Sequence, residues 1–207
     1  VLSSRGLGDV YKRQYINTDN GVTFNGVSSV TSADVVASNG IVHIVDAVIG
    51  LPSVVTFALA DPNFSSLVQA LTAYDYPQSF VGLLSIPAGS APSPFTVFAP
   101  VNSGFESLLD ELAVNSLYDI DEQTLGAVLS YHVVVSVNQM SNTLSDGMVI
   151  TTSLAQANPS IADLTFNVGD NGEGILTDNN GRTSNIIAVD VQADNGIIHA
   201  IDTVVLP

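Results

Sequence analysis

The chain has 207 residues, and its 20 Asp and Glu against 4 Lys and Arg give a formal net charge of −16. Such an acidic chain repels phosphate backbones and anionic lipid headgroups, so we expect no nucleic-acid partner and no binding to a membrane surface. No stretch approaches 18 consecutive apolar residues, so we expect no membrane insertion. It contains no Cys, which excludes disulfides, thiol catalysis and Cys-based metal sites.

The first 14 residues differ in character from the rest of the chain. Residues 4–14, SRGLGDVYKRQ, resemble the in-frame translation of a transposon-end sequencing adapter, and they hold three of the four cations. We therefore interpret residues 1–14 as a non-native assembly scar that lies outside the fold. Arg182 is then the one remaining cation, and the absence of a leader sequence carries no information about export.

The next segment, residues 15–52, ends in a stretch that recurs at the end of the chain. NGIVHIVDAVIGLP at residues 39–52 and NGIIHAIDTVVLP at residues 195–207 share Asn-Gly, a His, an Asp and a final Leu-Pro. Asn-Gly before an apolar run is typical of a hairpin turn with positive φ that leads into a buried strand. The repeat distance is that of a domain, so we interpret residues 15–52 as a domain end and residues 53–207 as a complete domain.

Helical patterns come first in residues 53–207. Ser53 can cap a short apolar helix that reaches Ala60, and Asp61-Pro62 can begin a second helix. Asp121 can cap a later helix with one apolar face. The residues that share this face are Leu125, Val128, Leu129 and His132.

Strand patterns appear between and after these helices. FTVFAP at residues 95–100 reads as a strand, and Ser103 and Glu106 have the spacing of a capping box that would begin the next helix. Residues 133–135 are expected to be extended, and the chain from Met148 on is expected to form strands and turns. Helices followed by strands indicate an α+β fold. We expect residues 95–100 and 197–205 to meet in its core.

Three segments carry a resemblance to a known family. FTVFAPVNSGF (residues 95–105), LSYHVV (129–134) and NGIIHAIDTVVLP (195–207) resemble, in order, the motifs of the fasciclin domain, although Gly104 stands where a larger residue is usual. The resemblance implies a fasciclin-like β-sandwich or wedge with a helical layer, and it makes residues 15–52 the tail of a preceding fasciclin domain. The motif residues to which it gives a structural role are Thr96, Phe98, Pro100, Asn102, Phe105, Asn195, Gly196, His199 and Asp202.

The same resemblance implies a function. It points to a non-catalytic adhesion or matrix-interaction module, extracellular or on the cell surface, without a cofactor. The expected partner is a cell-surface or matrix protein or a glycan, with self-association through tandem domains as a second mode. The Tyr-His region has been implicated in adhesion in this family, which points to Tyr131, His132, Val133 and Val134 as partner-binding residues. Packing of these residues in the core is the competing interpretation.

Two other function classes stay open from the residues. A hydrolase or metal-dependent enzyme would use His132, His199 and two Asp-rich turns, in which Asp170 and Asp178 are candidates for Ca²⁺. No HExxH or GxSxG motif accompanies them, so structural histidines and plain hairpin turns compete with this reading, and we expect no metal site. A carbohydrate-binding domain would call for exposed aromatic side chains, but the chain has no Trp.

Overall fold

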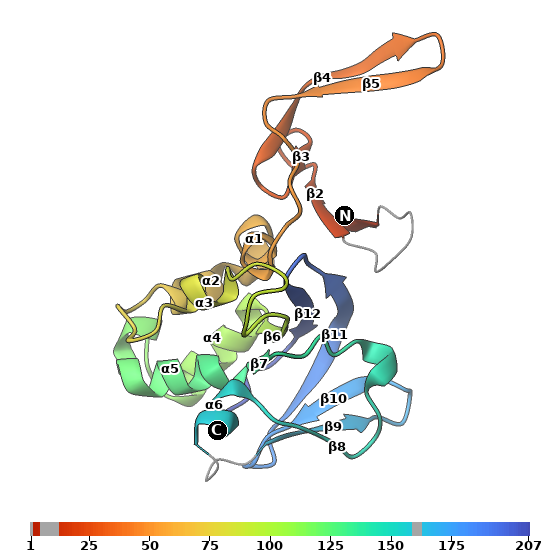
Figure 1. The fold of residues 1–207 in the computed structure, drawn as a ribbon. Helices are drawn as coiled ribbons and strands as arrows, with labels where there is room; N and C mark the ends of the chain where they lie inside the picture. The colour runs from red at the N-terminus through yellow and green to blue at the C-terminus, as the bar shows by residue number, and fades with distance from the viewer. Residues whose placement is uncertain (1, 5–12, 159–162) are drawn as a thin grey trace.

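The computed structural model describes residues 2–4, 13–158 and 163–207 (Figure 1). Most of the predicted scar, residues 1–14, lies outside these residues. Its described part joins a strand pair, in which β1 (Leu2–Ser4) runs antiparallel to β2 (Arg13–Asn17).

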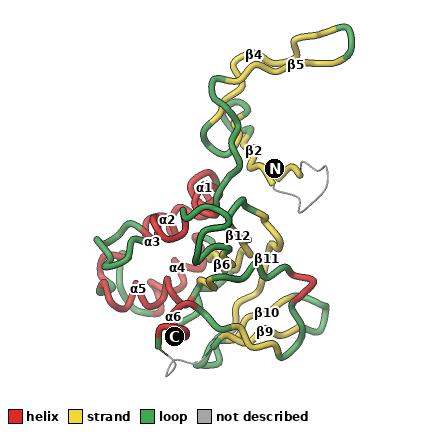
Figure 2. The backbone as a smooth tube through the Cα atoms, viewed as in Figure 1, coloured by secondary structure: helices red, strands yellow, loops and turns green. Residues whose placement is uncertain are grey.

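The strands form two sheets, which Figure 2 shows in yellow. The N-terminal sheet has the order β1-β2-β3-β4-β5, with β3 at Thr23–Phe24, β4 at Ser28–Ala37 and β5 at Gly40–Val45. The second sheet has the order β7-β6-β12-β11-β10-β9-β8. Its strands are β6 (Phe95–Pro100), β7 (Val133–Val135), β8 (Met148–Ile150), β9 (Leu164–Val168), β10 (Gly174–Thr177), β11 (Thr183–Gln192) and β12 (Gly196–Ile201).

The two most apolar strands pair with each other inside the second sheet. β12 runs parallel to β6, with Gly196 opposite Phe95 and Ile201 opposite Pro100. All six residues of each strand are buried, because helices cover one face of this pair and the rest of the sheet covers the other. The predicted meeting of these two segments, about a hundred residues apart in the chain, is confirmed.

The helices precede or interrupt the second sheet. They are α1 (Val54–Ala60), η1 (Pro62–Phe64), α2 (Ser65–Leu71), α3 (Phe80–Leu84), α4 (Asn102–Glu111), η2 (Leu117–Asp119), α5 (Glu122–Tyr131), η3 (Ser141–Thr143) and α6 (Ser153–Ala157). The predicted caps at Ser53 and Asp121 are confirmed, since their side chains accept the N–H groups of Thr56 and Thr124. The predicted capping box at Ser103 is wrong, because α4 begins at Asn102 with Val101 as its N-cap, two residues before the predicted cap.

Two hydrophobic clusters explain the shape of the domain. In the first, the helices pack on one face of β6 and β12. In the second, Phe98 and Ile201 from these central strands contact Phe166 and Leu176 from β9 and β10. The sheet therefore bends so that β9 and β10 pack against β6 and β12, which gives the expected α+β wedge with a helical layer (Figure 1).

The Asn-Gly turns differ from the expectation. Both hairpins form, but neither Gly40 nor Gly196 has a positive φ. Gly196 is required for another reason, since a Cβ there would lie 2.3 Å from the carbonyl oxygen of Phe95 on the paired strand. Gly40 has no described atom within 4 Å of the same position. Gly104 has a similar role to Gly196, because its Cβ would lie 2.8 Å from a carbonyl oxygen of β12's C-terminal extension.

The hairpin β4–β5 repeats the geometry of β11–β12. Asp34 and Asp190 both have left-handed backbone, with φ of 57° and 58°. The N–H of Asp34 donates to Nδ1 of His43 at 3.2 Å, and the N–H of Asp190 lies 3.5 Å from Nδ1 of His199. The repeats differ in burial, because most of β5 is exposed while all of β12 is buried. Figure 1 shows β4–β5 reaching away from the rest of the molecule.

Candidate functional site

The predicted partner-binding residues lie where α5 ends and β7 begins. Tyr131, His132, Val133 and Val134 are all buried, with at most 5% of each residue exposed. Burial, with the nearby Asp178 carboxylate as a second cause, raises the pKa of Tyr131 to about 12. A partner cannot contact Tyr131, His132 or Val134 directly in this conformation, whereas Val133 lines a groove that is described below. Their role in binding stays a prediction, and it would act through the surface that they support.

His132 is held by backbone groups at both ring nitrogens. Nδ1–H donates to the carbonyl oxygen of Val128 at 2.7 Å, and Nε2 accepts the N–H of Val205 at 3.2 Å. The carbonyl partner at Nδ1 fixes this tautomer. Burial lowers the pKa of His132 to about 4, against the smaller opposite effect of the bond to Val128. The ring is therefore neutral at pH 7, with neither nitrogen available to a metal or substrate.

His199 has a similar arrangement. Its Nε2–H donates to the carbonyl oxygen of Gln139 at 2.8 Å, and its ring stacks on Phe98 with centroids 5.6 Å apart. Burial lowers its pKa, although the bond to Gln139 and the charge of Asp190 act in the opposite direction. The two histidines use their nitrogens to hold backbone groups, so the geometry gives no support to the hydrolase alternative.

The Asp-rich segments are hairpin turns. Asp178 is buried, and its carboxylate accepts the N–H groups of Asn180, Arg182 and Leu206 at 2.9 Å each. Its oxygens are thus occupied by the turn and by the C-terminal segment. Asp170 is exposed between β9 and β10. Within the described ranges, no group of three or more His, Asp or Glu is placed to hold a metal ion.

Asn195 joins three elements of the core. Its side-chain oxygen accepts the N–H of Val54 at the start of α1 at 3.0 Å. Its Nδ2 donates to the carbonyl oxygens of Leu84 and Ile86, at 2.8 and 2.9 Å. Only 1% of Asn195 is exposed. This side chain ties α1 and the end of α3 to the turn before β12.

The other polar motif residues also hold backbone in place. Thr96 Oγ1 donates to the carbonyl oxygen of Val137, and the side chain of Asn102 bonds Ser66 N–H and the carbonyl oxygen of Pro62, all at 2.9 Å. Phe98 and Phe105 are buried, and Pro100 ends β6.

Asp202 organises the end of the β11–β12 hairpin. Its carboxylate accepts the N–H and the side-chain N–H of Asn185, at 2.8 and 2.7 Å, and the hydroxyl of Thr203 at 3.1 Å. Burial raises its pKa, but these hydrogen bonds together outweigh burial and hold the pKa below its usual value. The polar motif residues thus have structural partners within the domain.

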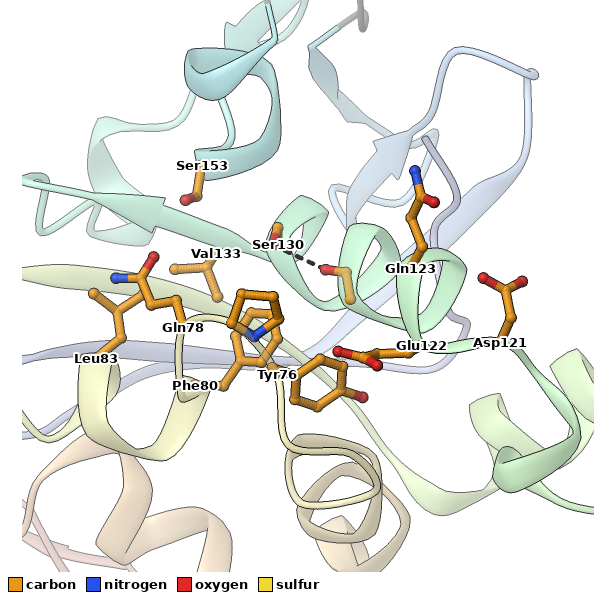
Figure 3. A pocket seen from close by; sticks show the side chains of 12 residues that line it. Tyr76, Gln78, Phe80, Leu83, Asp121, Glu122, Gln123, Ser130, Val133 and Ser153 are labelled. Atoms are coloured by element: carbon orange, nitrogen blue, oxygen red, sulfur yellow. Dashed lines mark hydrogen bonds between the residues drawn. The ribbon is translucent and has the colours of Figure 1, made fainter.

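An open groove of about 530 Å³ adjoins the Tyr131–His132 segment (Figure 3). The residues that line it are Tyr76, Pro77, Gln78, Phe80, Leu83, Asp121, Glu122, Gln123, Gly126, Ser130, Val133 and Ser153. Ser130 and Val133 flank the buried Tyr-His pair in the sequence. The sequence did not predict this groove, because its walls come from three separate segments of the chain. One signal was available, since Gly126 is a lone glycine inside a helical pattern.

The chain resembles known proteins in sequence. The fasciclin domain profile matches residues 8–52 and 62–207. An uncharacterised protein of Synechocystis, sll1735, is 32% identical over 156 residues, which cover 75% of this chain and 98% of that protein. Human periostin is 27% identical over 190 residues, which cover 91% of this chain and 20% of periostin.

A solved structure also resembles the whole chain. It is a FAS1 domain pair from the insect cell adhesion molecule fasciclin I, with a TM-score of 0.59 and 24% sequence identity. The match covers 100% of this chain and 67% of the other. At this identity the likeness is one of fold.

Proposed function

The chain belongs to the fasciclin domain family, and on this premise we propose that it is a non-catalytic binding module of an extracellular or cell-surface protein. Its partner is a cell-surface or matrix protein or a glycan. The observation that carries the proposal is the family match over two segments of the chain, together with the likeness to a domain pair from an insect cell adhesion molecule.

We further propose that residues 15–52 are the C-terminal part of one fasciclin domain and residues 53–207 a second, complete one. The shared features of β4–β5 and β11–β12 support this division. In both hairpins an Asp with positive φ faces a His, and Ser28 and Ser184 both donate to a carbonyl oxygen after the second strand, at 2.7 and 2.8 Å. Tandem domains would give the module two binding surfaces, or one for self-association.

Two observations favour binding over catalysis. Both histidines of the complete domain are hydrogen-bonded to backbone groups, and Ser130 in the groove wall donates its hydroxyl to the carbonyl oxygen of Gly126 at 2.9 Å. No nucleophile and base therefore face each other there.

None of the helices in the described part of the chain is long and apolar enough to cross a membrane.

Bead attachment tests the proposal. Beads coated with the full chain are washed over surfaces of collagen, cellulose, alginate and the chain itself, with albumin-coated beads as the control. We expect retention above the albumin control on at least one surface. Retention equal to albumin on every surface would refute the proposal, as would turnover of esterase or glycosidase substrates that is lost on His132→Gln without unfolding.

A further inference from the structure

The groove beside the Tyr-His segment has an apolar floor that is already in place. Tyr76 and Phe80 line it although each is only 8% exposed, and their rings meet edge to face at 5.0 Å. The hydroxyl of Tyr76 donates to the carbonyl oxygen of Ala70 at 2.9 Å, which fixes the ring. Burial raises the pKa of Tyr76 to about 12, so it stays an uncharged donor. A ligand therefore meets a rigid aromatic surface that needs little reorganisation.

One wall of the groove depends on a glycine. Gly126 lies within α5, where glycine makes a helix less stable than alanine does. A Cβ at this position would lie 3.5 Å from two atoms of the Tyr76 ring, which is ordinary van der Waals contact, so α5 lies close to the floor here and a side chain longer than a methyl group would have to project into the groove. The absence of a side chain at Gly126 keeps the groove open at a cost to the helix.

The rim of the groove is acidic. Asp121 and Glu122, at the start of α5, are exposed and line one end, and Figure 3 shows the Glu122 carboxylate beside the Tyr76 ring and the Asp121 carboxylate farther from it. Asp121 also caps the helix, but its exposed carboxylate still contributes negative charge. No Lys or Arg is among the lining residues, and the chain as a whole has a net charge of −16. An incoming cation meets attraction without a competing charge from the groove itself.

Uncharged polar groups complete the rim. Gln78, Gln123 and Ser153 stand around the opening (Figure 3). Amide side chains both donate and accept hydrogen bonds, which suits the backbone of an extended peptide. The volume of about 530 Å³ also falls in the range of roughly 300 to 1,000 Å³ that is typical of ligand sites.

We propose that this groove binds a short extended segment of a partner protein, in which an aromatic or aliphatic side chain packs on Tyr76 and Phe80 beside Gly126 and a neighbouring Lys or Arg meets Asp121 and Glu122. The charge of the rim and the apolar floor together select this occupant over an acidic or a purely polar one. The inference names the partner class of the proposed binding module and rests on that function.

The test measures fluorescence anisotropy of a labelled heptapeptide that alternates Lys with Phe and Leu, titrated with the full chain. Two matched peptides carry Glu in place of Lys, or Ser in place of Phe and Leu. We expect the Glu peptide not to bind and the Ser peptide to bind about tenfold more weakly or worse. Equal binding of the Lys-Phe-Leu and Ser peptides would overturn the proposal, because it would show that charge alone is recognised.

Substitutions of the acidic rim residues test whether the peptide binds in the groove. The pair Asp121→Asn and Glu122→Gln should weaken binding by about three- to fivefold, since two exposed charges are lost while Asn still caps the helix. The control pair Glu106→Gln and Asp110→Asn removes two exposed carboxylates from α4, outside the groove lining. It should change binding much less. Equal losses for both pairs would show non-specific attraction to an acidic surface and would refute the site.

A second variant separates binding from folding. Gly126→Ala should raise the melting temperature, because alanine favours the helix, and should change the affinity for the Lys-Phe-Leu peptide little, because its methyl group would only contact the Tyr76 ring. Gly126→Leu should abolish binding. Unchanged affinity in a folded Gly126→Leu would refute the groove as the site. If beads coated with Gly126→Leu are still retained in the attachment assay, the proposed binding function is kept and the groove is excluded as its site. Peptide binding without retention of beads on any surface would refute the proposed function alone.

Discussion

Replacing Asn195 by Ala tests how the repeated Asn-Gly segment holds the domain together. The change removes three buried hydrogen bonds, to Val54, Leu84 and Ile86. At a net value of about 1 kcal/mol for each bond, the free energy of unfolding should fall by about 3 kcal/mol. Asn39 occupies the same place in the first repeat and is exposed, so Asn39→Ala should change that free energy by less than about 0.5 kcal/mol.

The assay is urea denaturation of the full chain, followed by far-UV circular dichroism. Asn195→Asp is a second variant for the same assay. Its carboxylate can still accept the N–H of Val54, but an oxygen replaces the Nδ2 donor that faces two carbonyl oxygens. We expect Asn195→Asp to be at least as unstable as Asn195→Ala at pH 7. If Asn195→Ala and Asn39→Ala have the same small effect, the three bonds do not stabilise the fold and the reasoning is refuted.

Other predictions follow from burial and close contact. Between pH 6.5 and pH 4 the unfolded chain binds a proton at His132 that the folded chain does not, because the pKa of His132 in the folded chain is about 4. The free energy of unfolding should therefore fall by about 3 kcal/mol as the pH drops through this window. A His132→Gln variant whose stability falls with pH at the same slope would contradict this prediction. Gly196→Ala should cost about 1–3 kcal/mol in urea denaturation because its Cβ would meet the Phe95 carbonyl, while Gly40→Ala should cost nothing, and equal effects would refute the contact argument. A fragment that begins at Ser53 should melt in one cooperative transition, since every buried residue of the two core clusters lies after Ser53, although Tyr15 packs against the first cluster. A broad, non-cooperative melt would place the boundary elsewhere.

Much of the fold could be predicted because its signals are local. Ser53 and Asp121 precede apolar helical stripes, and their side chains reach N–H groups only three residues away. The strand at residues 95–100 and the final strand are apolar on both faces, which predicts a place inside the sheet. The short helices α3 and α6 were not predicted, since each has five residues and too little periodicity to recognise.

The errors and omissions come from contacts that are distant in the chain. Gly196 suggested a turn with positive φ, but its actual constraint is the backbone of Phe95 on another strand. The capping-box spacing at Ser103 was misleading because Asn102, which begins α4, uses its side chain to bond Ser66 in a different helix. The groove joins Tyr76 to Gly126 across fifty residues of sequence, so no local pattern contains it.

The most direct test of the account is bead attachment, because it measures binding by the whole chain without assuming the site. Beads coated with the folded chain should be retained on at least one of the four surfaces well above albumin-coated beads, and prior unfolding of the coat in urea should remove the excess. Retention at the albumin level on collagen, cellulose, alginate and the chain itself would contradict the conclusion that this fasciclin chain is a binding module.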